Sequence, residues 1–597
     1  MPVTQGSVTS EVGKVAAQDG LGRGVSRGLL LTLTLAAAAE FMAIPAQAMP
    51  DSEAEAIFFG GPIVTMDSDR PVVQAVAIAR GRIIAIGDRG TVFQRQGKGT
   101  QLIDLAGKAL LPGFHNSHVH PTLAAVTMGW EDVSGYSHPT EEASWLALRE
   151  AVKNYQPGEW VFAGGWDPIL VEGLQAPSLK ELDEIAPDNP LFIMPQGGHQ
   201  AYLNSRALAA AGITRQSPDP GHGAYYERDD KGELTGRLVE QPAFFPVQEK
   251  YGMPKTRAAW QSALQKVFRH YAKMGITSVT TMGVMIPLPE VLAIYEELTA
   301  TDPVLRHNVF ITWYARDQLL KLQPGAGHDY FRYKGMKIWY DGSPYSATML
   351  VEQPYLVNEF TREGIGIKPG AVGHANWSAE KLYQAVDEMH RRGWQLGIHT
   401  QGDRAAKEVL QVLEDVVRQA PRADARHRFE HLMLAEPAIF DRFARAGFTP
   451  SFHIQHIYYY GGILGDSLFG EARVKRLLPV QSALAAGLRP SLHSDHPMFP
   501  STPLEMVKTA VVRRTKEGAT VALEQGISVE QALRAVTINP AWQVHEEHNT
   551  GSIAVGKFAD LVVLSSNPLA VSAEQLDTIS VDATYVGGRL VWQAGTE

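Results

Sequence analysis

Short apolar runs alternate with amphipathic stretches through the middle of the chain. The stretches between the runs repeat apolar residues at helical spacing, for example over 379–392 and 404–419. This alternation of strand and helix is typical of a parallel α/β barrel. The runs that predict strands lie at 110–120, 276–282, 308–314, 334–341, 394–400, 428–431, 449–455 and 489–495. Because there are eight such runs, we predict a (β/α)8 barrel of the TIM type.

Both ends of the chain follow a different pattern, in which short strands are separated by turn residues. Strands are predicted over 57–67, 75–86 and 101–111, and again over 559–564 and 583–592. We interpret 55–111 and 546–597 as one small β-sandwich built from both chain ends, and 112–545 as the barrel domain.

One connection of the predicted barrel is anomalously long. Roughly 150 residues separate the first predicted barrel strand from the second, far more than a strand–helix connection needs. The segment has its own predicted strands, at 160–163 and 191–194. We interpret 131–262 as an inserted subdomain over the carboxyl-end face of the barrel, where active sites of this fold lie.

The amino-terminal segment has the pattern of a secretory signal. Arg23 and Arg27 precede an apolar run over 28–39, and Ala46-Gln47-Ala48 follows as a small-residue cleavage site. The run is shorter than the ~20 residues that a membrane span needs. We therefore predict a signal peptide over 1–48 and a periplasmic or secreted protein. A cytoplasmic protein is the alternative, if the segment is an alanine-rich leader that does not function.

Composition removes several classes of function. The 597 residues are 45% hydrophobic and 20% charged, which is ordinary for a soluble enzyme, and the net charge of −10 argues against a nucleic-acid partner. There is no cysteine, which excludes disulfides, cysteine-ligated zinc and a thiol nucleophile. We expect a small-molecule substrate and no membrane span, and the oligomeric state stays open.

The first predicted barrel strand ends in a histidine pair. His118 and His120 are two residues apart, so on a strand both side chains point to the same face and can aim at one metal ion. Asn116 shares this face, whereas His115 points the other way. A single pair of this kind is a weak signal.

Further polar residues fall where other predicted barrel strands end. They are Lys337, His399, His431 and Asp495, on the fourth, fifth, sixth and eighth strands. The carboxyl ends of barrel strands meet on one face, so these residues and the histidine pair can converge there.

These residues stand in motifs that are specific in combination. The motifs are Pro-Gly-Phe…His-Val-His, Lys-Ile…Asp-Gly-Ser, His…Gly-Asp-Arg-Ala, Arg-Phe-Glu-His, Ser-Asp-x-Pro and the closing Gly-Ser-Ile-Ala-Val-Gly-Lys-Phe-Ala-Asp-Leu. In their order they resemble the amidohydrolase superfamily. The resemblance is greatest to its YtcJ-like branch, amidohydrolase family 3, which includes N-substituted formamide deformylases and exoenzyme-regulatory proteins.

The resemblance implies one or two divalent metal ions, with zinc expected. His118 and His120 would bind the more buried ion, and His399 and His431 the second. Lys337, carboxylated by carbon dioxide, would bridge the two ions as a carbamate, because an ammonium cannot be a metal ligand. The alternative is an ordinary lysine paired with Asp341 or Asp403.

The resemblance also implies a reaction, the hydrolysis of a C–N bond in an amide, formamide or N-acyl compound. Asp495 would bind metal and act as general base for a metal-activated hydroxide. A turn or capping role for Asp495 is the simpler alternative. For the whole protein the alternatives are a single-metal deaminase or other hydrolase on the same barrel, and a non-catalytic binding or regulatory protein.

Other residues are weaker candidates. Those predicted to contact substrate are Trp166, Asp167, His199, Glu240, Asp341 and His456. Asp403 and His493 are predicted to support the metal ligands. His199 could instead be satisfied within the inserted subdomain, and His453 and His456 could simply pack a loop. His115, Asn116 and Thr281 depart from the residues usual in the superfamily.

Overall fold

Eight parallel strands of the chain form one sheet that curls into a barrel. The computed structural model describes residues 52–596 apart from 199, 222–223 and 287–288. The strands are hydrogen-bonded in the order in which they follow one another along the chain. They are β6 (Phe114–Val119), β13 (Ile276–Met282), β14 (Arg306–Thr312), β16 (Phe331–Trp339), β17 (Gln395–Thr400), β18 (Arg428–His431), β19 (Thr449–His453) and β20 (Ser491–His493).

The first and last of these strands are joined by backbone hydrogen bonds just beyond their carboxyl ends. The His120 amide donates to the His496 carbonyl oxygen at 2.8 Å, and the Asp495 amide donates to the His118 carbonyl oxygen at 3.1 Å. These bonds nearly close the barrel and confirm the predicted TIM-like α/β fold. They also set the predicted metal ligands of the two strands side by side.

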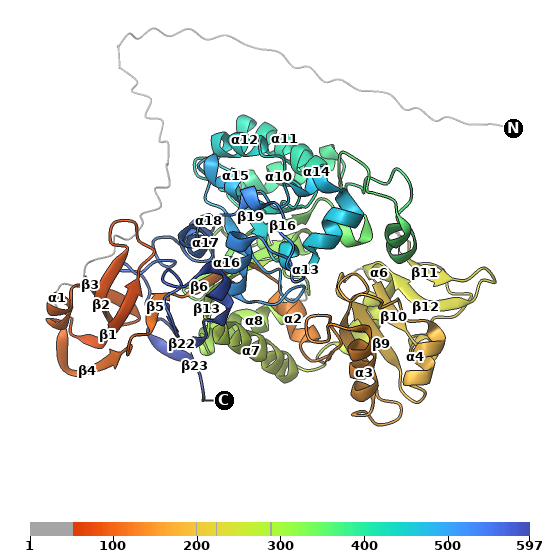
Figure 1. Cartoon of the computed structure of the whole chain (residues 1–597), viewed down its shortest axis with the longest axis horizontal. Helices are drawn as coiled ribbons and strands as arrows, with labels where there is room; N and C mark the ends of the chain where they lie inside the picture. The colour runs from red at the N-terminus through yellow and green to blue at the C-terminus, as the bar shows by residue number, and fades with distance from the viewer. Residues whose placement is uncertain (1–51, 199, 222–223, 287–288, 597) are drawn as a thin grey trace, which may run out of the picture. The chain divides into compact units, whose positions relative to one another are not determined.

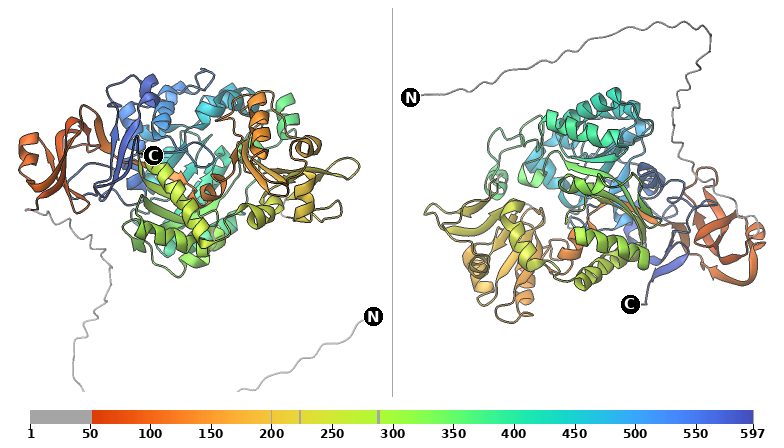
Figure 2. Two further views of the ribbon diagram at one scale, coloured as in Figure 1. Left: turned by 90° about the horizontal axis from the view of Figure 1, so that it is seen from below. Right: turned by 180° about the vertical axis from the view of Figure 1, so that it is seen from behind.

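Helices surround the barrel strands (Figures 1 and 2). The two helices predicted from their spacing are α10 (Ala379–Arg391) and α11 (Asp403–Gln419). The Ser378 side chain accepts a hydrogen bond from the Lys381 amide and so caps the start of α10. The other helices of this layer are α2 (Pro121–Thr127), α7 (Arg257–Lys273), α8 (Pro289–Thr301), α9 (Arg316–Leu319), α12 (Ile439–Ala446), α13 (His456–Ile463), α14 (Glu471–Val474), α15 (Val480–Ala485), α16 (Pro503–Val512), α17 (Val529–Ala535) and α18 (Ile538–Gln543).

Strands from both chain ends share a second sheet, which Figure 1 shows in red, orange and blue. Its members are β1 (Ala54–Val64), β2 (Val72–Ala79), β3 (Arg82–Gly87), β4 (Gln96–Asp104), β5 (Ala109–Pro112), β21 (Leu561–Leu564), β22 (Val581–Val586) and β23 (Arg589–Gln593), with the short α1 (Arg89–Phe93) beside them. The join of the two ends is the pairing of β5 with β21. The two-layer packing of a sandwich stays a prediction.

The predicted first barrel strand is in fact two strands, which meet at Gly113. Residues before it belong to β5 in the terminal sheet, and residues after it belong to β6 in the barrel. A Cβ at Gly113 would lie 2.1 Å from Thr277 Cγ2, so the close passage of the chain past β13 requires glycine.

A third sheet lies in the long connection between β6 and β13. Its strands are β7 (Glu131–Asp132), β8 (Val161–Trp166), β9 (Leu191–Pro195), β10 (Gln200–Leu203), β11 (Tyr225–Arg228) and β12 (Leu234–Val239), accompanied by α3 (Glu141–Val152), α4 (Leu179–Ile185), α5 (Ser205–Ala211) and α6 (Gln241–Val247). The Tyr136 hydroxyl of this segment donates to the Met498 carbonyl oxygen at 3.1 Å. The inserted segment therefore contacts the loop that follows β20.

Some predictions fall outside the described residues. They are the signal peptide over 1–48 and the substrate role of His199. Within the described part of the chain, none of the helices combines the length and the apolar character needed to traverse a bilayer.

Candidate metal centre

Two histidines and one carboxylate meet at the carboxyl end of β6. His118 Nε2 lies 3.3 Å and His120 Nε2 lies 3.0 Å from the same oxygen, Asp495 Oδ1. Asp495 has a φ of 57°, in the left-handed region, as the chain turns away from β20. The two strand ends therefore present nitrogen and oxygen donors to one point, as the histidine pair predicts.

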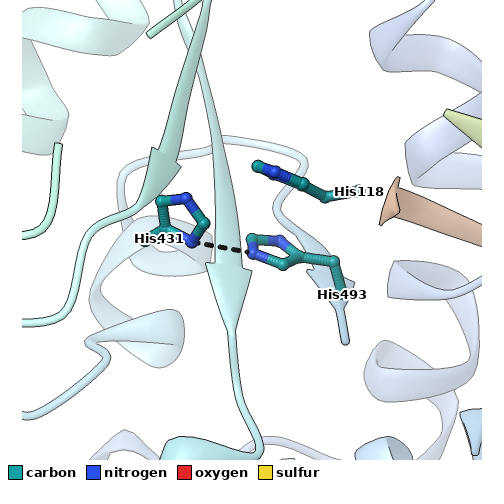
Figure 3. Close-up of side chains that lie close together, drawn as sticks. All are labelled: His118, His431 and His493. Atoms are coloured by element: carbon teal, nitrogen blue, oxygen red, sulfur yellow. Dashed lines mark hydrogen bonds between the residues drawn. The ribbon is translucent and has the colours of Figure 1, made fainter. Parts of the chain in front are cut away.

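Three further histidines adjoin this group. His493 Nε2 lies 3.2 Å from His431 Nδ1, and the His493 ring stacks on that of His118 with centroids 4.6 Å apart (Figure 3). The rings of His399 and His431 are 4.5 Å apart. The imidazoles of β6, β17, β18 and β20 thus form one continuous cluster.

Hydrogen bonds on Nδ1 fix the rings of this cluster. An oxygen of a carboxylate or carbonyl group can only accept, so its histidine partner must carry hydrogen on Nδ1 and leave Nε2 as a bare lone pair. The pairs are His118 with Glu430 at 2.8 Å, His120 with the Gly283 carbonyl at 3.1 Å and His399 with Asp341 at 2.9 Å. Neutral imidazoles with free Nε2 atoms are the form that binds a divalent ion.

Burial sets the charge state of these groups. It holds the pKa values of His118, His431 and His493 well below their usual range, so the rings are neutral. Burial alone raises the pKa of the Asp495 carboxyl, but the neighbouring rings of His120, His453 and His493 outweigh it and hold that pKa below its usual range. The centre therefore pairs neutral nitrogen ligands with one carboxylate anion.

Lys337 is fully buried beside the cluster. Its Nζ lies 3.4 Å from His118 Nε2, and burial lowers its pKa to about 8. The predicted alternative, an ion pair with Asp341 or Asp403, is not formed, because Asp341 is held by His399 and Asp403 by Arg476 at 2.8 Å.

The donor set fits a divalent cation. Three groups of side chains each place one ligand atom per residue within 4.8 Å of the others. They are His118, His120 and Asp495; His118, His431 and His493; and His431, His453 and Asp495. Among the described residues, Asp495 Oδ1 and both ring nitrogens of His453 are buried without a hydrogen-bond partner, and an ion would satisfy them.

Comparison of the sequence with known proteins identifies the family of the chain. The sequence model of the amidohydrolase family matches residues 101–592. The chain belongs to the amidohydrolase family. It is 30% identical over 559 residues to protein LONG AFTER FAR-RED 3 of Arabidopsis thaliana, spanning 90% of this chain and 92% of that one. It is 28% identical over 545 residues to the N-substituted formamide deformylase of Arthrobacter pascens, spanning 89% and 96%.

A solved structure supports the fold. An uncharacterized metal-dependent hydrolase from Pyrococcus horikoshii OT3 superposes with a TM-score of 0.68 at 22% sequence identity, over 87% of this chain and 99% of that one. The sequence model thus confirms the family that the motifs predict, and this structure confirms the barrel.

Two aspartates of this amidohydrolase make contacts other than those predicted. Asp341, predicted to contact substrate, binds His399 and accepts hydrogen bonds from the amides of Leu350, Gln401 and Gly402. Asp403, predicted to support the ligands, instead binds Arg476 and the Glu352 amide. Asp341 is fully engaged and buried, which leaves it no contact with a substrate.

The remaining predicted substrate contacts lie in different surroundings. Trp166 is fully buried in the core of the inserted sheet, where its indole N–H donates to the Gln175 carbonyl, so we remove it from the site. Glu240 precedes α6 with a φ of 64°. Asp167 and His456, by contrast, belong to a chain of contacts that reaches the histidine cluster.

Asn116 does not point into the centre as strand alternation predicts. Its side-chain amide donates to the Ser494 and Ser501 hydroxyls at 2.6 and 2.9 Å and so fastens β6 to the chain beyond β20. His115 does face away, with Nε2 2.9 Å from the Thr280 hydroxyl.

Sequence reasoning gave no role to Arg428 and Glu430, and it treated His453 only as a residue that could pack a loop. Glu430 orients His118 and is itself paired with Arg428 at 2.8 Å, although both were visible in the Arg-Phe-Glu-His motif. His453 ends β19 and could have been found by the rule that identified His399 and His431, a histidine at a strand end.

Proposed function

We propose that this amidohydrolase uses divalent metal to hydrolyse the C–N bond of an amide, formamide or N-acyl compound. The convergence of free Nε2 atoms on the Asp495 carboxylate carries the proposal. The name of the relative from Arthrobacter pascens, an N-substituted formamide deformylase, supports the choice of bond.

A divalent ion bound by these ligands would polarise the scissile carbonyl and lower the pKa of water to roughly 7. The Asp495 carboxylate then accepts the proton of the attacking water and passes it to the leaving nitrogen. Its depressed pKa keeps it ionised for the first transfer. Glu430 and Asp341 hold His118 and His399 in the orientation that leaves Nε2 available.

Lys337 is proposed to be carboxylated. A pKa of about 8 leaves an appreciable fraction of its amine neutral at neutral pH. The neutral amine attacks carbon dioxide, a C–N bond forms, and one proton is released as the carbamate anion appears. The anion would relieve the burial of an ammonium among histidines and supply two further oxygen ligands.

A second reading is a hydrolase or deaminase with one ion. It is favoured by the group of His118, His120 and Asp495, which is complete without Lys337. In that case the lysine stays unmodified, and the Lys337→Ala variant keeps its metal.

Activity assays with metal removal test the proposal. N-substituted formamides and N-acyl amides are offered to protein purified without chelators, then to chelated protein, then to protein resupplied with zinc. We expect activity to disappear and return, and Asp495→Asn to lower kcat by about 10²–10⁴-fold. Asp387→Asn on the surface of α10 is the matched control. Full activity of the chelated enzyme would contradict the proposal.

A further inference from the structure

His456, the first residue of α13, is buried with one ring nitrogen unsatisfied. Its side chain lies beside the metal centre, with its ring 4.0 Å from that of His453 and 4.9 Å from that of Phe499. Nδ1 lies 2.6 Å from the Tyr345 hydroxyl, whereas Nε2 has no partner among the described residues. Buried polar atoms without partners are rare and call for a ligand.

The Tyr345 contact determines which nitrogen carries the hydrogen. Burial raises the pKa of Tyr345 well above its usual range, so the phenol keeps its single O–H. The described residues give this hydroxyl no acceptor other than His456 Nδ1. If the hydroxyl donates to Nδ1, the neutral ring must carry its hydrogen on Nε2. The unsatisfied nitrogen is therefore a hydrogen-bond donor.

A chain of contacts from the inserted segment holds Tyr345 in place. The Tyr345 ring packs against that of Tyr460 with centroids 4.6 Å apart, and the Tyr460 hydroxyl donates to Asp167. Asp167 also accepts hydrogen bonds from the amides of Ile169 and Leu170 at 2.9 and 3.1 Å. Asp167, predicted to contact substrate, thus binds Tyr460 and the chain that follows it.

We propose that His456 Nε2–H donates a hydrogen bond to the carbonyl oxygen of the substrate, and that Tyr345 is the positioning residue that fixes this tautomer. The inference rests on the proposed function, because an amide or formamide supplies the acceptor. Negative charge gathers on that oxygen as the carbonyl is attacked, so a fixed buried donor stabilises the transition state more than the ground state. His453 connects this donor to the general base, because its ring lies 4.0 Å from that of His456 and its Nδ1 lies 3.9 Å from Asp495 Oδ2.

Four variants test this role. His456→Ala removes the donor, and His456→Gln keeps an N–H. Tyr345→Phe keeps the aromatic ring but removes the hydroxyl that fixes the His456 tautomer. Tyr459→Phe is the matched control, because that hydroxyl lies on the same helix and donates to Glu505, away from His456. Each variant is assayed for kcat, KM, metal content and thermal midpoint with the best formamide or amide substrate.

We expect His456→Ala to lower kcat about 10²-fold with KM, metal content and thermal midpoint nearly unchanged. His456→Gln should recover part of the loss, Tyr345→Phe should lose about tenfold, and Tyr459→Phe should match the wild type. If His456→Ala does not fold, Tyr345→Phe decides, since it deletes only one oxygen.

Two results would overturn the donor role. One is a fully metallated His456→Ala variant with kcat within twofold of wild type. The other is parallel loss of metal and activity, which would make His456 a ligand. Failure of the proposed function looks different, because metal-loaded wild type would then turn over no amide or formamide at all.

Discussion

Three histidines of the candidate centre, His118, His120 and His399, are oriented by an oxygen atom that accepts from Nδ1. Glu430 does this for His118, and its other oxygen is paired with Arg428 in a fully buried site. The carboxylate determines where the hydrogen of His118 resides, so it determines whether Nε2 can bind metal. A residue that does not itself bind the metal, such as Glu430, can therefore affect metal affinity.

Replacing Glu430 with glutamine should weaken metal binding about 10–100-fold, because the amide no longer fixes the His118 tautomer. Zinc retention after dialysis against graded chelator measures the loss. Glu414→Gln is the control, since Glu414 pairs with Arg442 near the surface. Equal retention by both variants would show that Glu430 has no part in metal binding.

Lys337 makes stability depend on pH. Burial lowers its pKa from 10.5 to about 8, so between these values the unfolded chain binds more protons than the folded protein. The contribution of Lys337 to the stability of metal-free, CO₂-free protein should therefore be lowest below pH 8 and increase toward pH 10.5, by roughly 3 kcal/mol.

The difference between wild type and Lys337→Met in denaturant unfolding isolates this effect. Lys557, whose pKa burial also lowers to about 8, contributes equally to both proteins and cancels. A Lys337→Met variant with the same pH dependence as wild type would contradict the assignment.

Strand alternation predicts some ligands and fails at others for a physical reason. His118 and His120 lie on a regular strand end, so a spacing of two places both at Asp495. His431 has a φ of 76°, which ends β18 and lets it reach the cluster together with the preceding Glu430. A left-handed turn of this kind leaves no mark in the periodicity, and Glu430 was therefore missed.

At the scale of elements, the carboxyl ends of β16 and β17 are tied by one side chain. Asp341 follows β16 and accepts hydrogen bonds from His399 and from the amides of Gln401 and Gly402 after β17. A fourth bond comes from the Leu350 amide. Asp341 thus fixes the backbone at Leu350 and after β17, and it also orients the His399 ring.

Asp341→Ala should lower the thermal midpoint by several degrees and reduce bound metal, because it leaves buried N–H groups unpaired at about 1–3 kcal/mol each. Calorimetry and metal analysis of the same samples check both effects. Asp415→Ala on α11 removes a carboxylate from an exposed pair with Arg418 and should change neither. An unchanged thermal midpoint in Asp341→Ala would contradict a stabilising role for these hydrogen bonds.

The barrel strands could be predicted closely, because strands of a parallel sheet are buried on both faces and most of them carry short apolar runs. The boundary at Gly113 could not. Residues 110–120 were predicted as one strand, and the pairing of residues 109–112 (β5) with β21, some 450 residues later, separates them from β6. Pairing between residues so far apart cannot be predicted from the pattern of a short stretch of sequence.

At the scale of the whole molecule, a buried ion pair joins the barrel to the terminal sheet. Arg306 of β14 binds Asp560, which precedes β21, at 2.6 Å, and both side chains are almost fully buried. Asp560 also accepts a hydrogen bond from the Gly587 amide at 2.8 Å. The chain ends therefore stabilise the barrel through one carboxylate.

Asp560→Ala should destabilise the protein by about 3–5 kcal/mol, since it strands the Arg306 guanidinium in the interior. Asp582→Ala, which breaks a partly exposed pair with Lys108, should cost ~1 kcal/mol or less. Urea unfolding of the two variants side by side gives the comparison. Similar urea midpoints for the two variants would mean that the buried Arg306–Asp560 pair adds no more to stability than the exposed pair does.

The protein is proposed to bind metal through His118, His120, Asp495 and their neighbours. Metal content per chain, measured by inductively coupled plasma mass spectrometry on protein purified without chelators, tests this proposal most directly. We predict one or two divalent ions per chain, with two ions falling to fewer in Lys337→Ala if the carbamate bridges them. Protein that holds no metal, even after supplementation with zinc, would contradict the account.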